Sequence, residues 1–167
     1  MKKVSFVSTL FALLIGWPVC AQEGPHIADN APVDCAFETT TNDLFGVIEE
    51  KSPEAMKSWP DAKARFQRGL PDKHSLFITF VLVDQEQRVE YVFLAVDDIS
   101  DEGVSGRLST EVFNVQGFNF GDRFLVDEEA ISDWLITKPD GTEDGNLIGK
   151  YLDTLQQCAH LNNANQQ

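Results

Sequence analysis

The sequence predicts an α+β fold, in which an antiparallel, strongly bent sheet carries N-terminal helices and a C-terminal helix packed on it. Three observations lead to this prediction. Helix start and stop signals gather in residues 41–71, β-branched and aromatic runs fill the middle of the chain, and an amphipathic segment comes last. Strands that come in a run, flanked by helices rather than alternating with them, are typical of α+β domains.

The first 21 residues have the pattern of an export signal. Lys2 and Lys3 form a short positive region, an apolar run follows over residues 4–16, and small side chains precede a cleavage point after Ala21. The apolar run is shorter than the roughly 20 residues that a membrane-spanning helix needs. We therefore expect a cleaved signal peptide and a periplasmic protein. Lipidation of Cys20 and a retained anchor are the alternatives.

Cleavage after Ala21 would leave two cysteines, Cys35 and Cys158, at opposite ends of the chain. Two cysteines in an oxidising compartment favour a disulfide between them. A loop of that length would be expected to stabilise the fold by roughly 4–5 kcal/mol, less any native strain. Two unpaired, partly buried thiols are the alternative.

The remaining chain is long enough for one domain with a substantial core. We expect an extended segment over residues 22–40, which are rich in Pro, Gly and polar residues, a single α+β domain over residues 41–160, and a disordered tail over residues 161–167. No segment repeats at a fixed period.

Charge limits the possible partners. The chain has a formal net charge of −14, and its 13 Lys and Arg residues are scattered among 27 Asp and Glu residues. Nucleic acids and anionic membranes need clustered basic side chains, so they are poor partners. We expect no stable membrane insertion once the signal is removed, and a basic protein or a cation is the more plausible partner.

Helix signals come first in the domain. Thr41 or Asn42 can cap a first helix, and Ser52-Pro53-Glu54 has the pattern of a second helix start, with serine as N-cap and proline at the first position. Pro60 would break or kink that second segment, and Gly69-Leu70-Pro71 would end it.

Strands follow. Residues 75–84 and 88–98 are β-branched and aromatic runs joined by a short polar turn, which predicts a hairpin of two long strands. A shorter strand is expected over residues 104–110. Residues 111–122 have the composition of a loop, and residues 123–127 that of another strand.

The run Ile131-Ser132-Asp133-Trp134 follows a burst of acids that predicts a short helical turn beginning near Asp127. An indole in this setting most often fills core space, with its N–H bound to a partner. The carboxylate of Asp133 is placed to bind nearby backbone N–H groups. A ligand-facing Trp134 and a catalytic role are the alternatives.

The last element is predicted from helical spacing after a glycine-rich turn. Apolar side chains recur along one face of residues 147–161. They are Leu147, Ile148, Tyr151, Leu152 and Leu155.

Metal and cofactor signatures are absent from the sequence, so we expect neither a metal nor a cofactor. Neither Cys-x-x-Cys nor His-Glu-x-x-His occurs. Residues 140–145 match the first half of a calcium loop, with oxygen-bearing side chains at Asp140, Thr142 and Asp144. Such a loop closes with a glutamate at its twelfth position, where this chain has Tyr151.

From about residue 55 to residue 155 the chain resembles the bacterial YegJ-like domain of unknown function family (DUF2314). The motifs that carry the resemblance are Glu90 in VEYVFLA, Gly106 in VSGRL, Gly121-Asp122, ISDW from Ile131 to Trp134, and DGNLIGKYL from Asp144 to Leu152 with its preceding turn. The resemblance implies a helix, a hairpin, and a last helix after a glycine-asparagine turn. It implies no established activity.

Two positions depart from the expected family pattern. Phe93 stands where a tryptophan is expected shortly after Glu90, and the basic residue of the last motif is Lys150. Analogy with similar small domains in toxin–antitoxin neighbourhoods suggests an immunity-like binding role.

Two functional hypotheses follow, with an envelope structural or stress protein as a weaker third. The leading one is a non-catalytic periplasmic domain that binds a protein partner through an acidic, aromatic-bearing sheet face. Its candidate binding residues are Asp133, Trp134, Phe93 and Lys150. The alternative is an envelope hydrolase, whose candidate catalytic carboxylates are Glu90, Asp122 and Asp133.

Overall fold

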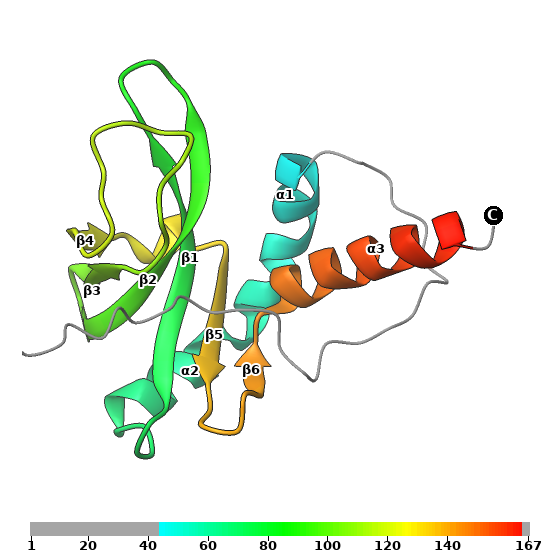
Figure 1. Cartoon of the computed structure of the whole chain (residues 1–167). Helices are drawn as coiled ribbons and strands as arrows, with labels where there is room; N and C mark the ends of the chain where they lie inside the picture. Colours follow the sequence, from blue (N-terminus) through cyan, green and yellow to red (C-terminus); the bar gives the residue numbers. More distant parts are fainter. Residues whose placement is uncertain (1–43, 165–167) are drawn as a thin grey trace, which may run out of the picture.

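The computed structural model describes residues 44–164, and the side chains of residues 45–155 within them. Three helices, two 3-10 turns and six strands make up this part of the chain (Figure 1). In order they are α1 (Leu44–Ala55), η1 (Met56–Ser58), α2 (Trp59–Gln67), β1 (Ser75–Val83), β2 (Val89–Ser100), β3 (Gly103–Leu108), β4 (Arg123–Val126), η2 (Glu128–Ala130), β5 (Asp133–Thr137), β6 (Glu143–Gly145) and α3 (Leu147–Ala164). The α+β prediction is confirmed.

The first helix runs further than the sequence predicts. α1 continues through Pro53, so the predicted start of a second helix at Ser52 is wrong. The Ser52 hydroxyl instead donates a 2.6 Å hydrogen bond to the carbonyl of Ile48, four residues back in the same helix. The chain turns later, through η1, and Pro60 then lies in the first turn of α2, where no intrahelical partner for its missing N–H is needed. The predicted caps Thr41 and Asn42 lie outside the described residues.

The six strands form one antiparallel sheet in the order β4-β3-β2-β1-β5-β6. The predicted hairpin is confirmed as β1 and β2. Gly106 of β3 lies so close to β2 that a Cβ atom there would overlap the carbonyl oxygen of Ala95, which explains a glycine in mid-strand. The expected helical turn before Asp133 is η2, and the predicted loop over residues 111–122 is the segment between β3 and β4.

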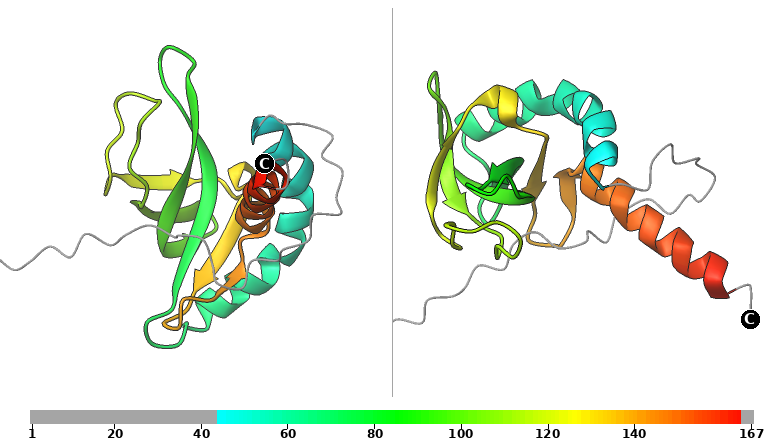
Figure 2. Two further views of the ribbon diagram at one scale, coloured as in Figure 1. Left: turned by 45° about the vertical axis from the view of Figure 1, so that its right-hand side comes forward. Right: turned by 90° about the horizontal axis from the view of Figure 1, so that it is seen from above.

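The sheet bends strongly without closing, and α2 lies across its inner face (Figure 2). Alternate residues of each strand point to this face, as the two-residue period of a strand requires. The buried core there combines residues from α2 and from all the long strands. Its members include Trp59, Ala62, Leu76, Ile78, Phe80, Leu82, Val92, Leu94, Val104, Leu108, Val126, Trp134 and Ile136.

The helices α1 and α3 pack against each other and against β5, away from α2 (Figure 2). On the other face of the sheet, the ring of Phe45 on α1 lies 5.3 Å from the ring of Tyr91 on β2. Val47, Ile48, Ala55 and Ile148 are buried, and they lie on these two helices. Within residues 44–164, no helix is long and apolar enough to cross a membrane.

Candidate functional site

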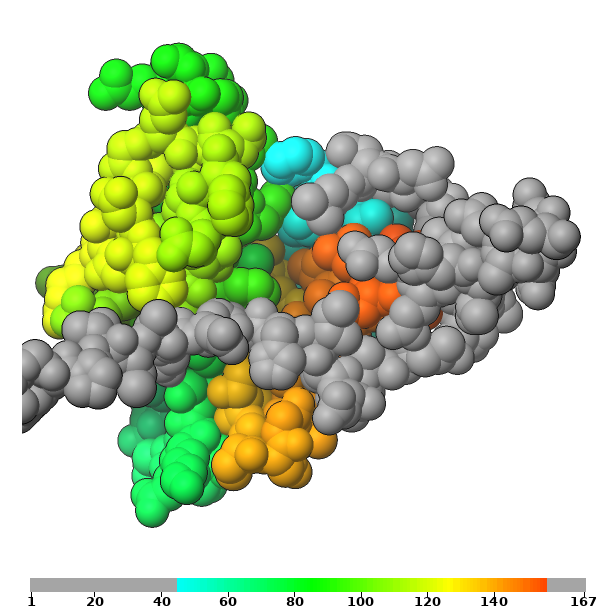
Figure 3. Space-filling view, viewed as in Figure 1, coloured from blue at the N-terminus to red at the C-terminus, as the bar shows by residue number. Residues whose placement is uncertain are grey.

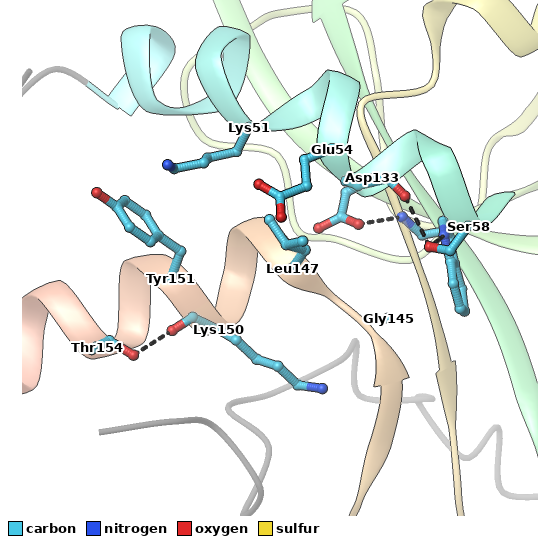
Figure 4. Close-up of a pocket in the computed structure, with 11 residues that line it drawn as sticks. Lys51, Glu54, Ser58, Asp133, Gly145, Leu147, Lys150, Tyr151 and Thr154 are labelled. Atoms are coloured by element: carbon cyan, nitrogen blue, oxygen red, sulfur yellow. Dashed lines mark hydrogen bonds between the residues drawn. The ribbon is translucent and has the colours of Figure 1, made fainter. Parts of the chain in front are cut away.

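A pocket of about 460 Å³ lies between α1, the start of β5 and the first turns of α3 (Figure 4). Two helical segments form its walls. In each, the lining residues are a first residue and those three, four and seven positions after it, which lie on one face of a helix. The α1–η1 wall consists of Lys51, Glu54, Ala55 and Ser58, the α3 wall of Leu147, Lys150, Tyr151 and Thr154, and the floor of Asp133, Trp134 and Gly145.

Asp133 occupies the floor and is 2% exposed. Its Oδ1 accepts a 2.8 Å hydrogen bond from the backbone N–H of Trp134, and its Oδ2 accepts one of 2.8 Å from the backbone N–H of Ile148 in the first turn of α3. Burial raises the pKa of Asp133 to about 6, although these N–H groups, that of Leu147 and the charge of Lys150 act in the opposite direction. The structure therefore contains the predicted hydrogen bonds from nearby backbone N–H groups to the carboxylate of Asp133.

The turn before α3 explains the glycine-asparagine pair. Gly145 and Asn146 both have positive φ, at 76° and 55°. A Cβ atom on Gly145 would overlap the carbonyl oxygen of Trp134 and lie 2.8 Å from its ring carbon Cε3, so only glycine fits. The backbone N–H of Asn146 donates a 2.7 Å hydrogen bond to that same carbonyl, and its side-chain amide donates one of 2.7 Å to the buried carboxylate of Glu143.

Trp134 is buried, and its side chain is part of the core against α2, as the sequence predicts for an indole. The indole N–H donates a 3.2 Å hydrogen bond to the Ser58 hydroxyl, which places the indole edge between the core and the pocket. Lys150 also lines the pocket, and its ammonium group donates a 3.1 Å hydrogen bond to the carbonyl of Glu143.

The upper wall of the pocket carries charge. The Lys51 ammonium group pairs with Glu50 at 2.9 Å and lies 4.7 Å above the ring of Tyr151. The carboxylate of Glu54 points from α1 toward Leu147 on the opposite wall (Figure 4). Within the described residues, Glu54 makes no hydrogen bond and no ion pair.

Glu90 lies far from this pocket and holds a loop. Its carboxylate accepts hydrogen bonds from the backbone N–H groups of Phe113, Asn114 and Val115, at distances of 2.6 to 3.2 Å. Burial by itself would raise the pKa of Glu90, but these three donors outweigh it and lower the pKa below its usual value.

The side chain of Asp122 also binds within its own neighbourhood. Its Oδ2 accepts a 2.8 Å hydrogen bond from the backbone N–H of Asn119 in the same turn. This turn adjoins the end of β3, three strand spacings or about 14 Å from β5. Glu90 and Asp133 lie on opposite faces of the sheet, because Glu90 pairs with Leu82 on the core side and Asp133 pairs with Thr79 on the other. The structure thus does not bring the three candidate carboxylates together.

Phe93 shares a sheet face with Asp133 but does not line the pocket. Thr79 pairs with Phe93 on one side and with Asp133 on the other, so the three form a row across β2, β1 and β5. Phe93 is half-buried there. Among the described residues, no group of three or more His, Cys, Asp and Glu side chains is arranged to hold a metal ion.

The comparisons with known proteins add one finding. Residues 59–162 match the family described as an uncharacterized protein conserved in bacteria (DUF2314). The chain belongs to the DUF2314 family. No curated protein and no solved structure matches it.

The DUF2314 match includes the floor and the α3 wall of the pocket, and it leaves out α1. Lys51 and Glu54 lie in this preceding helix, and sequence reasoning missed them as site residues. No local sequence signal identifies them, because they line the pocket only through the packing of α1 against α3. The predicted disulfide partners, Cys35 and the side chain of Cys158, lie outside what the structure describes.

Proposed function

We propose that this DUF2314 domain is an exported, non-catalytic module that binds a protein partner, and that its pocket takes a lysine or arginine side chain of that partner. One observation carries the proposal. The carboxylate of Glu54 points into a pocket lined by both apolar and charged side chains, and among the described residues it makes no hydrogen bond and no ion pair, although its charge acts on nearby Lys51.

Such a pocket suits a long basic side chain. The methylene stem of a lysine or arginine can lie against Ala55, Leu147 and the ring of Tyr151, while its charged end reaches Glu54. The negative charge of the whole chain favours the approach of a basic partner. The two lysines of the pocket are already engaged, since Lys51 pairs with the carboxylate of Glu50 and the Lys150 ammonium group donates a hydrogen bond to the backbone carbonyl of Glu143.

Export is the second part of the proposal, and it rests on the signal pattern of residues 1–21. Expression of the full chain in a Gram-negative host, followed by N-terminal sequencing of the periplasmic fraction, tests it. A mature protein that begins at Gln22 is expected. Full-length protein in the cytoplasm would contradict export and leave the pocket proposal standing.

An envelope hydrolase is the second candidate, because Asp133 is a buried carboxyl in a pocket with a pKa of about 6. Both of its oxygens accept backbone N–H groups, however, and Glu90 and Asp122 lie elsewhere in the fold. Turnover of ester, peptide or glycoside substrates that Asp133→Asn abolishes would favour the hydrolase.

Two capped tripeptides, acetyl-Leu-Lys-Leu-amide and acetyl-Leu-Glu-Leu-amide, provide a direct test of the pocket. In a two-dimensional NMR titration of the purified domain, the lysine peptide is expected to shift the amide signals of Glu54, Ser58, Gly145 and Tyr151. The glutamate peptide is expected to leave them in place, because it would bring like charges together.

The matched variants are Glu54→Gln and Glu49→Gln. Both remove one exposed carboxylate from α1, but only Glu54 lines the pocket. Weaker binding of the lysine peptide in the first variant alone is expected. Equal responses to the two peptides, or equal effects of the two variants, would exclude the pocket as a site for basic side chains.

A further inference from the structure

A second surface feature lies on the segment between β3 and β4, residues 109–122. Phe113 in this segment is 88% exposed, which makes it the most exposed large hydrophobic side chain among the described residues. The segment forms a broad part of the molecular surface beside the tip of the β1–β2 hairpin, in yellow-green in Figure 3. A phenylalanine held in water has no stabilising role in the folded domain, because it buries almost no area.

The backbone that carries Phe113 is held in place by residues of the β1–β2 hairpin. The carboxylate of Glu90 accepts the backbone N–H groups of residues 113, 114 and 115. The side-chain amide of Asn114 donates a 2.8 Å hydrogen bond to the carbonyl of Val89, and the backbone N–H of Gln116 donates one of 3.1 Å to Asp84. Phe113 therefore projects from a pre-organised loop, and fixing it on binding would cost little conformational entropy.

The same segment covers the core with other side chains. Val115 is buried in the core, and Val112 and Phe118 pack against it. The ring of Phe118 lies 5.9 Å from that of Phe124 on β4. These contacts account for the need to brace the segment, but they do not require an aromatic side chain at position 113.

Charge around Phe113 points to one class of partner. Residues 84–90 and 109–122, which make up the hairpin turn and the segment, hold five acidic side chains and one basic one. The basic one, Arg88, is paired with Asp84 at 2.7 Å and with Glu86 at 3.1 Å. A second copy of the chain would bring the same acidic surface and a net charge of −14, and an anionic membrane would repel it similarly.

We propose that Phe113 is the anchor of a docking surface for a basic protein, one that offers an apolar pocket rimmed by lysine or arginine side chains. Aromatic anchors that insert into such pockets carry much of the binding energy of protein interfaces. The inference rests on the proposed function in one respect only, which is that the domain binds a protein partner. It assigns a different surface from the α1–β5–α3 pocket.

Photo-crosslinking tests the proposal on the full chain in its producing bacterium. The crosslinking amino acid benzoylphenylalanine replaces Phe113 in one variant and Gln67, an exposed residue at the end of α2, in the control. A crosslink to one basic protein from position 113 and not from position 67 is expected. No crosslink, the same crosslinks from both positions, or a crosslink to a second copy would overturn the proposal, as would binding of the purified chain to phosphatidylcholine vesicles that Phe113→Ser abolishes.

The captured protein is then purified and its affinity measured against variants. Phe113→Ser is expected to weaken binding by about 30-fold or more, which is the effect of an interface hot spot, without lowering the unfolding temperature. Glu111→Lys is expected to weaken it and to reduce its dependence on salt. Binding that survives Phe113→Ser but is lost in Glu54→Gln would overturn this inference and leave the pocket proposal intact, whereas binding lost in neither variant would contradict both.

Discussion

The carboxylate of Asp133 on β5 caps the helix α3 through a 2.8 Å hydrogen bond from the backbone N–H of Ile148. Its other oxygen accepts the backbone N–H of Trp134 at 2.8 Å. One side chain thus joins the start of β5 to the first turn of α3, fifteen residues later in the chain. Because that helix forms one wall of the pocket, the shape of the pocket depends on this contact.

The first prediction concerns the pH dependence of stability. Burial raises the pKa of Asp133 to about 6 in the folded domain, and an unfolded aspartate titrates near 4. Between these values the folded state binds more protons than the unfolded state, so the free energy of unfolding falls as pH rises. From the two pKa values, this group lowers stability by up to about 3 kcal/mol between pH 4 and pH 7.

Asp133→Asn removes that titration. Urea unfolding of both proteins at pH 4, 5, 6 and 7 is expected to show that the wild type loses stability relative to the variant across this window. Other carboxylates titrate in both proteins, including Glu90 with its lowered pKa, so they drop out of the difference. A difference that stays constant, or one that favours the wild type more at pH 7 than at pH 4, would contradict the raised pKa.

The second prediction concerns the turn before α3. Gly145→Ala is expected to destabilise the domain by about 3 kcal/mol or more, because the added methyl group both strains a positive φ and collides with Trp134. Gly117→Ala is the matched control. Gly117 also has a positive φ, at 90°, but a Cβ atom there would meet nothing within 4 Å. A loss of only about 1 kcal/mol is therefore expected for the control, measured by thermal or urea unfolding.

If the two alanine variants lose the same amount of unfolding free energy, then backbone strain alone makes glycine necessary at position 145. The close contact with Trp134 would then contribute nothing. That outcome would also remove the steric reason for the close approach of β6 to β5 at the floor of the pocket.

The sequence predicted the strands β1 to β4 better than the helix boundaries, whereas β6 lies where only a glycine-rich turn was expected. The long apolar runs of β1 and β2 can be interpreted only as a hairpin, because their β-branched residues favour strands and the polar turn between them favours a tight connection. Ser52-Pro53 had two interpretations. Proline fits the first turn of a helix, but the structure places it inside α1, where Ser52 bonds back to Ile48.

Only some of the pocket residues could be predicted from the sequence, and the reason differs from that for the helix boundaries. Asp133 and Trp134 could be recognised because both residue types need local partners, and those partners are a few residues away or on the next element. Lys51 and Glu54 form a wall only because α1 lies against α3, and local sequence patterns do not specify which helix faces meet. The opposite sides of the sheet taken by Glu90 and Asp133 likewise depend on strand register.

The third prediction concerns the loop that Glu90 holds. Glu90→Gln is expected to destabilise the domain by about 1–3 kcal/mol, because an amide offers one acceptor oxygen to three backbone N–H groups. Hydrogen exchange of the amides of residues 113–115 is expected to accelerate in the variant. The control is Glu111→Gln, which removes an exposed carboxylate from the same segment.

Exchange that accelerates equally in both variants would show that these amides respond to the loss of negative charge in general. Unchanged exchange in Glu90→Gln would show that the loop is held by the burial of Val115 alone, and Phe113 would then not need Glu90 to keep its position.

The fourth prediction is the disulfide between Cys35 and Cys158, which follows from the expected export of the chain. The protein purified from the periplasm should react with iodoacetamide at no cysteine under denaturing conditions, and at two after reduction. Reduction is expected to lower the free energy of unfolding by roughly 4–5 kcal/mol, less any strain in the native bond, because the bridge closes a loop of more than a hundred residues in the unfolded chain. Cys35→Ser provides the control, since it should match the reduced wild type in stability and be insensitive to reductant. Two reactive thiols before reduction would contradict the pairing.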